Sequence, residues 1–305
     1  RQALPPSPLH HGRMLLAPMV GVIDTCVLQA PPELEQECSG GQGSAAALVE
    51  ATLEQLQPRK APHSGYPLGY TLPVPLLQLF RADGSDWVID AERVGRLVRT
   101  VQDNARPLVL YLFSTHFSAG APIEEALAQD AANLARTRDG PLPIDSYYGD
   151  PVYPWTLART DNGITARRVQ ATRAFLDALC QLPSHDLAKI RGVTLLGELH
   201  QLFPDFQAGM GFAPPYRVTD YSAASVAGFQ RFLQAQFGNV AQLNRVLGAD
   251  YTDFSEVAPP SRDIRSEPLR RYTEHIDSYA QGSLPIAGWA YVPGGRPAWV
   301  HVYRS

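Results

Sequence analysis

The stretch GVTLLGELHQLF, residues 192–203, decides the fold that this sequence predicts. Its first half, 192–197, carries too few polar positions for a half-exposed strand, which indicates a strand buried on both faces. The run then meets Glu198, with His200 two positions further on. In a barrel of parallel strands the functional groups follow the strand ends, so these two side chains are candidates for chemistry.

Three earlier apolar runs have the same character and cover 14–22, 70–80 and 108–113. Helical patterns separate them. Asp90 is suited to the N-cap of one helix and Pro122 to the first turn of a second. The expected apolar faces of three helices are Val94, Leu97, Val98 and Val101; Ile123, Leu127 and Leu134; and Val169, Phe175, Leu176, Leu179 and Leu182.

Alternating strands and helices predict an α/β fold with a parallel sheet, of the (β/α)8 TIM-barrel type. The chain has 305 residues, of which 45% are hydrophobic, enough to bury a large core. A barrel takes about 250 residues. Residues 199–283 read as loop and helix, with no run of strands five to eight, so the sequence allows the barrel to be incomplete within this chain.

Polar side chains follow the predicted strands in a consistent way. Asp24 comes after the first run, His116 after the third, and Glu198 and His200 after the fourth. The long segment 144–163 mixes aromatic rings with hydrogen-bonding groups, a composition suited to sugar rings and also to a loop that packs on itself. Its candidate substrate-binding residues are Tyr147, Tyr148, Trp155, Asp161 and Asn162.

Composition excludes several classes of partner. With 26 basic and 30 acidic residues, a net charge of -4 and no run of Lys or Arg, the chain lacks the basic face of a nucleic-acid-binding protein. No apolar stretch approaches the roughly 18 residues of a membrane span. Neither a glycine-rich phosphate loop nor a G-x-S-x-G elbow occurs, and no cofactor is implied.

The three cysteines, Cys26, Cys38 and Cys180, have no metal-type spacing, and we expect free thiols. The alternative is a disulfide between Cys26 and Cys38, which an oxidising compartment would allow. The compartment stays open, with a secreted or periplasmic location favoured over a cytoplasmic one.

Residues 220–260 carry the most specific pattern. Ser222 is suited to cap a helix that Gly238 ends, and a second short helix ends at Gly248. The sequence of about 190–260 resembles that of family 42 β-galactosidases and related clan A glycoside hydrolases. The matching residues are Tyr221, Ser222, Phe229, Phe232, Leu233, Phe237, Gly238, Leu243, Asn244, Gly248, Tyr251, Phe254, Pro259 and Pro260.

The resemblance implies a glycoside hydrolase acting on an oligo- or polysaccharide, similar to a β-galactosidase. Glu198 would be the general acid/base at the end of the fourth barrel strand, and Tyr221 a substrate contact. The family has Asn before this glutamate, whereas this chain has Gly197. Such enzymes need a second carboxylate, about 5 to 5.5 Å away when retaining and about 6.5 to 9.5 Å away when inverting. We identify none, and Asp24, Asp145 and Asp150 are weak stand-ins.

The C-terminal residues indicate a second module. Residues 282–305 alternate around a Pro-Gly-Gly turn, which predicts a β-hairpin that begins a β-sandwich-like module. The barrel domain would then cover 1–281.

Three alternatives stay open. His116, His200, Asp24 and Glu198 could bind a metal, although no close-spaced His pair supports it. The chain could be a catalytically inactive carbohydrate-binding barrel protein of polysaccharide assembly, since one catalytic carboxylate is identified. Glu198 could also be a structural carboxylate paired with an arginine.

Overall fold

The computed structural model describes residues 14–21, 23–29, 38, 43–56, 66–114, 120–147, 150–156, 158–195, 220–259, 262–263 and 275–276. The chain divides into two compact units, 1–225 and 226–305, and each is described by itself.

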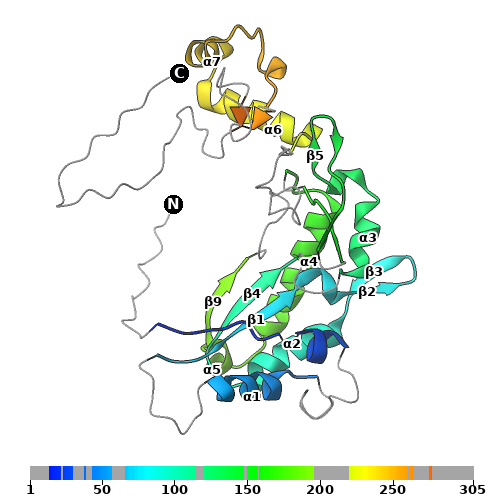
Figure 1. Ribbon diagram of the computed structural model, residues 1–305, viewed down its shortest axis with the longest axis vertical. Coiled ribbons are helices and arrows are strands. Elements are labelled where there is room, and N and C mark those ends of the chain that lie inside the picture. The colour runs from blue at the N-terminus through cyan, green and yellow to red at the C-terminus, as the bar shows by residue number, and fades with distance from the viewer. Residues whose placement is uncertain are drawn as a thin grey trace, which may run out of the picture. The chain divides into compact units, whose positions relative to one another are not determined.

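The first unit is built on a parallel sheet of three strands, in the order β1 (Tyr70–Pro75), β4 (Leu108–Phe113) and β9 (Ile190–Thr194). Their arrows lie side by side and point the same way (Figure 1). The register pairs Tyr70 with Leu108, and Leu110 with Val193. The parallel sheet predicted from the apolar runs is therefore confirmed for these three strands.

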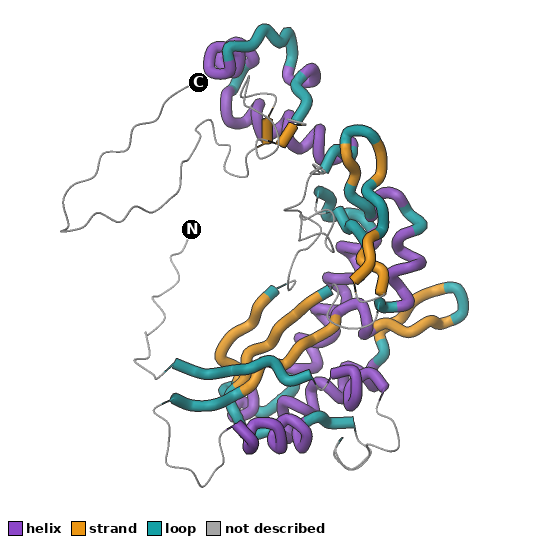
Figure 2. The backbone as a smooth tube through the Cα atoms, in the orientation of Figure 1, coloured by secondary structure: helices purple, strands orange, loops and turns teal. Residues whose placement is uncertain are grey.

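A fourth segment, 14–21, continues the sheet beyond β1. Parallel bridges join Leu16 to Leu68 and Met19 to Thr71, and the amide of Thr71 donates to the carbonyl of Pro18 at 2.8 Å. Figure 2 draws this segment as a loop that runs beside the strands. The predicted strand thus lies in the expected place, but it forms isolated bridges and not a continuous ladder. Sheet order follows chain order throughout.

The second predicted run, 70–80, is not one strand. β1 ends at Pro75, the short 3-10 helix η3 (Leu76–Leu79) follows, and Phe80 begins a hairpin. The hairpin consists of β2 (Phe80–Asp83) and β3 (Asp86–Ile89). Proline has no amide proton to donate to a neighbouring strand. The leucines of η3 are buried although they do not belong to a strand.

Helix α2 (Ala91–Asp103) begins as the sequence predicts. The Asp90 carboxylate accepts hydrogen bonds from the amides of Glu92 and Arg93, at 3.0 and 3.2 Å. Its expected apolar face packs into the core, with Leu97 and Val101 fully buried. The helix contacts α4 (Gly163–Leu179) and α1 (Ala46–Leu56), a helix that is not predicted from the sequence.

Helix α4 presents a different face from the expected one. Phe175 and Leu179 are buried, but Val169 is 43% exposed, and the inner face continues through Ala171 and Arg168. The helix ends before Leu182, and the short α5 (Ser184–Leu187) leads to β9.

Between β4 and α4 the chain makes a long excursion that carries most of the predicted binding residues. Its elements are α3 (Pro122–Ala128), the 3-10 helix η4 (Ala131–Asn133), the hairpin of β5 (Arg136–Thr137) and β6 (Gly140–Pro141), and the hairpin of β7 (Asp145–Tyr147) and β8 (Asp150–Val152). Pro122 begins α3 as predicted, but the helix ends at Ala128, so Leu134 lies beyond it.

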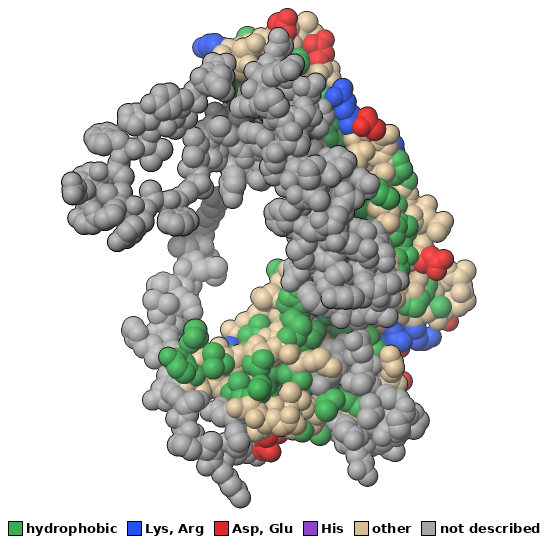
Figure 3. All heavy atoms as spheres, viewed as in Figure 1, with side chains coloured by type: hydrophobic (Ala, Val, Ile, Leu, Met, Phe, Trp, Pro, Cys, Tyr) green, Lys and Arg blue, Asp and Glu red, His purple; other side chains and the backbone are tan. Residues whose placement is uncertain are grey.

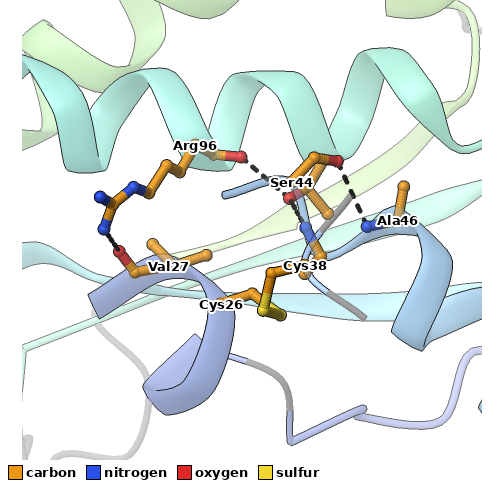
Figure 4. Close-up of a disulfide and its surroundings, with 8 residues drawn as sticks. Cys26, Val27, Cys38, Ser44, Ala46 and Arg96 are labelled. Carbon is orange, nitrogen blue, oxygen red and sulfur yellow. Dashed lines mark hydrogen bonds between the residues drawn. A yellow bond between two sulfur atoms is a disulfide. The ribbon is translucent and has the colours of Figure 1, made fainter. Parts of the chain in front are cut away.

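A disulfide joins Cys26 to Cys38, so the expectation of free thiols is wrong for this pair (Figure 4). Cys26 lies in the π-helix η1 (Ile23–Gln29), which packs on α2. Arg96 of α2 donates to the carbonyl of Val27 at 3.0 Å. Cys180 is free and exposed, as expected.

The described part of the second unit is mainly helical. The helix α6 (Ala223–Phe237) ends at Gly238 and α7 (Val240–Leu247) at Gly248, and both glycines have a positive φ, as the sequence predicts. Leu233, Leu243 and Val257 form a small core. The remaining elements are η7 (Phe254–Glu256), β10 (Arg262–Asp263) and β11 (His275–Ile276).

The described residues add no further strand to the parallel sheet, which does not close into a barrel within them. The predicted hairpin after residue 282 and the boundary at 281 lie outside the described residues. Among the described helices, none has the length and hydropathy that crossing a membrane requires.

Candidate functional site

The residues predicted for the site fall into three groups. Glu198, His200, His116 and Tyr148 lie outside the described residues. Asp24 and Tyr147 have a described backbone only, in η1 and β7. The side chains that the structure describes are those of Trp155, Asp161, Asn162 and Tyr221.

The strand β9 precedes Glu198 in the sequence and shows which edge of the sheet the chain leaves before that residue. This strand ends at Thr194, which pairs with Tyr111 of β4. Val193 and Thr194 are exposed, and Leu195 after them is 70% exposed, so the prediction of a strand buried on both faces is wrong for this run. Because β9 runs parallel to β4 and β1, the carboxyl ends of the three strands share one edge of the sheet. Glu198 comes four residues after that edge in the sequence.

Trp155 lies inside the excursion between β4 and α4. It forms a bridge with Leu134, stacks on Tyr153 with ring centroids 5.1 Å apart, and is 1% exposed. Its indole Nε1 donates to the Glu124 carboxylate at 3.4 Å. The ring is therefore held by protein contacts on all sides.

Glu124 is a buried carboxylate outside the set of predicted site residues. One oxygen accepts from the Ala121 amide at 2.8 Å and the other from Trp155. Burial raises its pKa to about 7, against the opposing effect of these hydrogen bonds and of Arg168. The sequence signal was available: a glutamate two residues after Pro122 occupies the third position of the helix, from which it can cap the first turn.

Asn162 caps α4. Its Oδ1 accepts from the Thr165 amide at 3.2 Å, and its Nδ2 donates to the carbonyl of Ala132 at 3.1 Å. The neighbouring Asp161 is exposed and forms a two-point ion pair with Arg159, with both contacts at 2.9 Å. Asn162 thus has both side-chain groups engaged, whereas Asp161 faces solvent.

Tyr221 is fixed at its backbone, where the amide donates to the carbonyl of Arg136 at 2.8 Å. Burial raises the pKa of its phenol to about 12, so the hydroxyl is protonated at neutral pH.

The preceding residue, Asp220, is the centre of a polar cluster. Its carboxylate accepts from the Arg136 amide at 3.0 Å, from the Ser222 amide at 2.8 Å, and from the hydroxyls of Thr156, Ser222 and Ser225. Burial works against ionisation here, but the hydrogen bonds outweigh it and hold the pKa below its usual range. The carboxylate is therefore ionised at neutral pH.

Three predicted residues meet on one short segment. Trp155 bridges Leu134, Asn162 reaches the carbonyl of Ala132, and Tyr221 reaches that of Arg136. All three partners lie within 131–136. The structure thus brings together residues that are up to 66 positions apart in the sequence, but it does not place them relative to Glu198.

The described residues contain no group of three His, Cys, Asp or Glu side chains that could hold a metal ion. The alternative of a metal site involves His116, His200, Asp24 and Glu198, whose side chains the structure does not describe.

Comparison with known proteins adds one partial relationship. No family model matches the chain. The thermophilic beta-amylase of Thermoanaerobacterium thermosulfurigenes is 33% identical over 67 residues, which are 21% of this chain and 12% of that protein. The chain thus spans a small part of the relative's length. The similarity supports the broad class of glycoside hydrolases and does not single out family 42.

Proposed function

We propose that this chain belongs to a glycoside hydrolase of the barrel type, which cleaves an oligo- or polysaccharide with Glu198 as general acid/base. The observation that carries the proposal is the 67-residue similarity to a beta-amylase. The strand order gives independent support, since 14–21, β1, β4 and β9 follow one another in chain order, as the first four strands of such a barrel do.

The edges of the sheet favour a closed barrel in the whole protein. At one edge Met14 and Leu16 are 65% and 43% exposed, and at the other Val193 and Leu195 are 47% and 70% exposed. Hydrophobic side chains gather on the face shown in Figure 3. Exposed apolar side chains suit packing against further parts of a barrel. Pro18 and the exposed Arg191 lie on the same two segments.

The chemistry requires a proton donor for the leaving oxygen. A glutamate that the rest of an active site buries can have its pKa raised toward neutrality, as an acid catalyst needs. We propose that Asp24, His116, His200 and the tyrosines 147 and 148 contact the sugar near it. Trp155 and Asn162 are buried and engaged by protein contacts, so the prediction that they bind sugar is wrong. The exposed Asp161 and the half-buried Tyr221 stay candidates for sugar contacts.

The finer specificity is open to direct assay. The protein from its full reading frame should be incubated with starch, galactan and a panel of nitrophenyl glycosides, while new reducing ends and nitrophenol are measured. Release of sugar that is lost in the Glu198→Gln variant supports the proposal. Saturable sugar binding without turnover by the unaltered protein would favour a carbohydrate-binding protein, and neither binding nor turnover would overturn both.

A further inference from the structure

A cavity of about 430 Å³ opens along the first half of α4. Val169, three arginines and three threonines line it. The arginines and threonines are Arg159, Arg168, Arg173, Thr160, Thr165 and Thr172. Its volume lies in the range of small-molecule sites, about 300 to 1,000 Å³.

Arg168 is the unusual member of this lining. The side chain is 5% exposed, and neither Nε nor Nη2 has a hydrogen-bond partner. A buried charged donor without an acceptor is costly, and native proteins rarely keep one. The nearby Glu124 attracts it through space, but its two carboxylate oxygens already accept from Ala121 and Trp155.

The other lining groups differ in what they can still donate. The hydroxyls of Thr165 and Thr172 donate to the carbonyls of Arg159 and Arg168, at 3.0 and 2.8 Å. Arg159 is shared with Asp161. Among the described residues, Thr160 and Arg173 make no such contact, and both are exposed at the cavity.

We propose that this cavity binds a phosphate or sulfate group, with Arg168 as the inner anchor and Arg173 and Thr160 at the mouth. The planar guanidinium matches the oxygens of such an anion in pairs, and its free N–H groups are the donors that the anion needs. Nε and Nη2 are screened from solvent, so the guanidinium must turn toward the cavity for an anion to reach them. The volume leaves room for the sugar body of an ester. This inference is independent of the proposed glycosidase activity.

Titration calorimetry on the intact protein tests the site, with inorganic phosphate, sulfate, glucose 6-phosphate and neutral glucose as probes. We expect saturable binding of the anions. The Arg168→Met variant should bind them roughly tenfold more weakly or worse, and Arg173→Gln several-fold more weakly. Arg191→Gln, which removes an exposed charge from β9, is the matched control and should change little. Should Arg168→Met fail to fold, Arg173→Gln and Thr160→Val decide.

Comparing the affinities for the probes also separates a free anion from a sugar phosphate. Equal affinity for phosphate and glucose 6-phosphate identifies a site for the free ion, whereas tighter binding of the ester identifies a sugar phosphate. Absence of saturable anion binding overturns the proposal. Equal weakening in Arg173→Gln and Arg191→Gln also overturns it, because a general field effect would then explain the binding.

Discussion

The carboxylate of Asp220 accepts a hydrogen bond from the backbone amide of Arg136 at 3.0 Å, across 84 positions of sequence. The same carboxylate receives the amide and hydroxyl of Ser222, at the start of α6. One side chain thus joins the beginning of that helix to the hairpin of β5 and β6, and holds Tyr221 beside it.

The Asp220→Ala variant should therefore lose several buried or half-buried hydrogen bonds at once. Leaving backbone amides without an acceptor and removing a helix cap lead us to expect a loss of about 1 to 3 kcal/mol in unfolding free energy. Urea denaturation measures it. Asp139→Ala, an exposed aspartate in the β5–β6 turn, is the control, and equal losses in the two variants would show that the Asp220 contacts add no stability.

Glu124 predicts a pH dependence of stability. Its pKa is raised from 4.5 in the unfolded reference to about 7 in the folded protein, chiefly by burial. The folded state therefore retains a proton that the unfolded state has lost between these values, so stability falls as the pH rises from about 4.5 to about 7.

The Glu124→Gln variant keeps the shape of the protonated acid and should remove up to about 3 kcal/mol of that decline. Thermal unfolding across this pH range provides the measurement, with Glu125→Gln on the exposed side of α3 as the matched variant. An unchanged slope in Glu124→Gln would assign the decline to other groups.

The disulfide should stabilise the first unit. The bond between Cys26 and Cys38 closes a short loop, and both residues are buried. Replacing both with Ala should lower the unfolding free energy by about 2 to 4 kcal/mol, as for other native disulfides. Chemical denaturation with and without reductant tests this, and Cys180→Ala should behave like the unaltered protein. If reductant leaves the unaltered protein's stability intact, the bond does not contribute.

Gly69 tests the register of the sheet. A Cβ at this position would lie 2.0 Å from the carbonyl oxygen of Pro107, where β1 and β4 meet. Backbone atoms cannot move aside easily, so Gly69→Ala should cost roughly 2 kcal/mol or more. In β9, a Cβ at Gly192 would come no closer than 3.9 Å to Val109, and Gly192→Ala is the control. If Gly69→Ala leaves the unfolding free energy unchanged, the two strands do not approach each other as closely as described.

The sequence predicted the parts of the fold that depend on local patterns. The apolar runs of β4 and β9, the Asp90 cap and the glycine ends of α6 and α7 need only neighbouring residues to be recognised. The end of β1 at Pro75 was missed because apolar composition alone does not separate a strand from a buried turn. Pairing of Cys26 with Cys38 depends on where η1 packs, which spacing does not reveal.

The candidate site divides in the same way. Residue types in 144–163 and around 220 were recognised, but their meeting on 131–136 rests on contacts between distant segments. Glu124 was not predicted as a site residue because its raised pKa comes from burial beside Trp155, which depends on tertiary structure. The position of Glu198 relative to these residues stays a prediction.

The central claim, that Glu198 delivers a proton to the leaving sugar, predicts a difference between two substrates. Losing a positioned general acid typically costs about 10² to 10⁴ in rate when the leaving group is poor. An activated aryl glycoside has a leaving group that needs little protonation and should be affected much less.

The decisive measurement is kcat/KM of the Glu198→Gln variant, relative to the unaltered protein, for a natural oligosaccharide and for the nitrophenyl glycoside of the same sugar. We predict a loss of at least about 10² on the oligosaccharide and a clearly smaller loss on the aryl glycoside, with sugar affinity retained. Equal losses on both substrates, or full activity on the oligosaccharide, would contradict the assignment of Glu198 as the general acid.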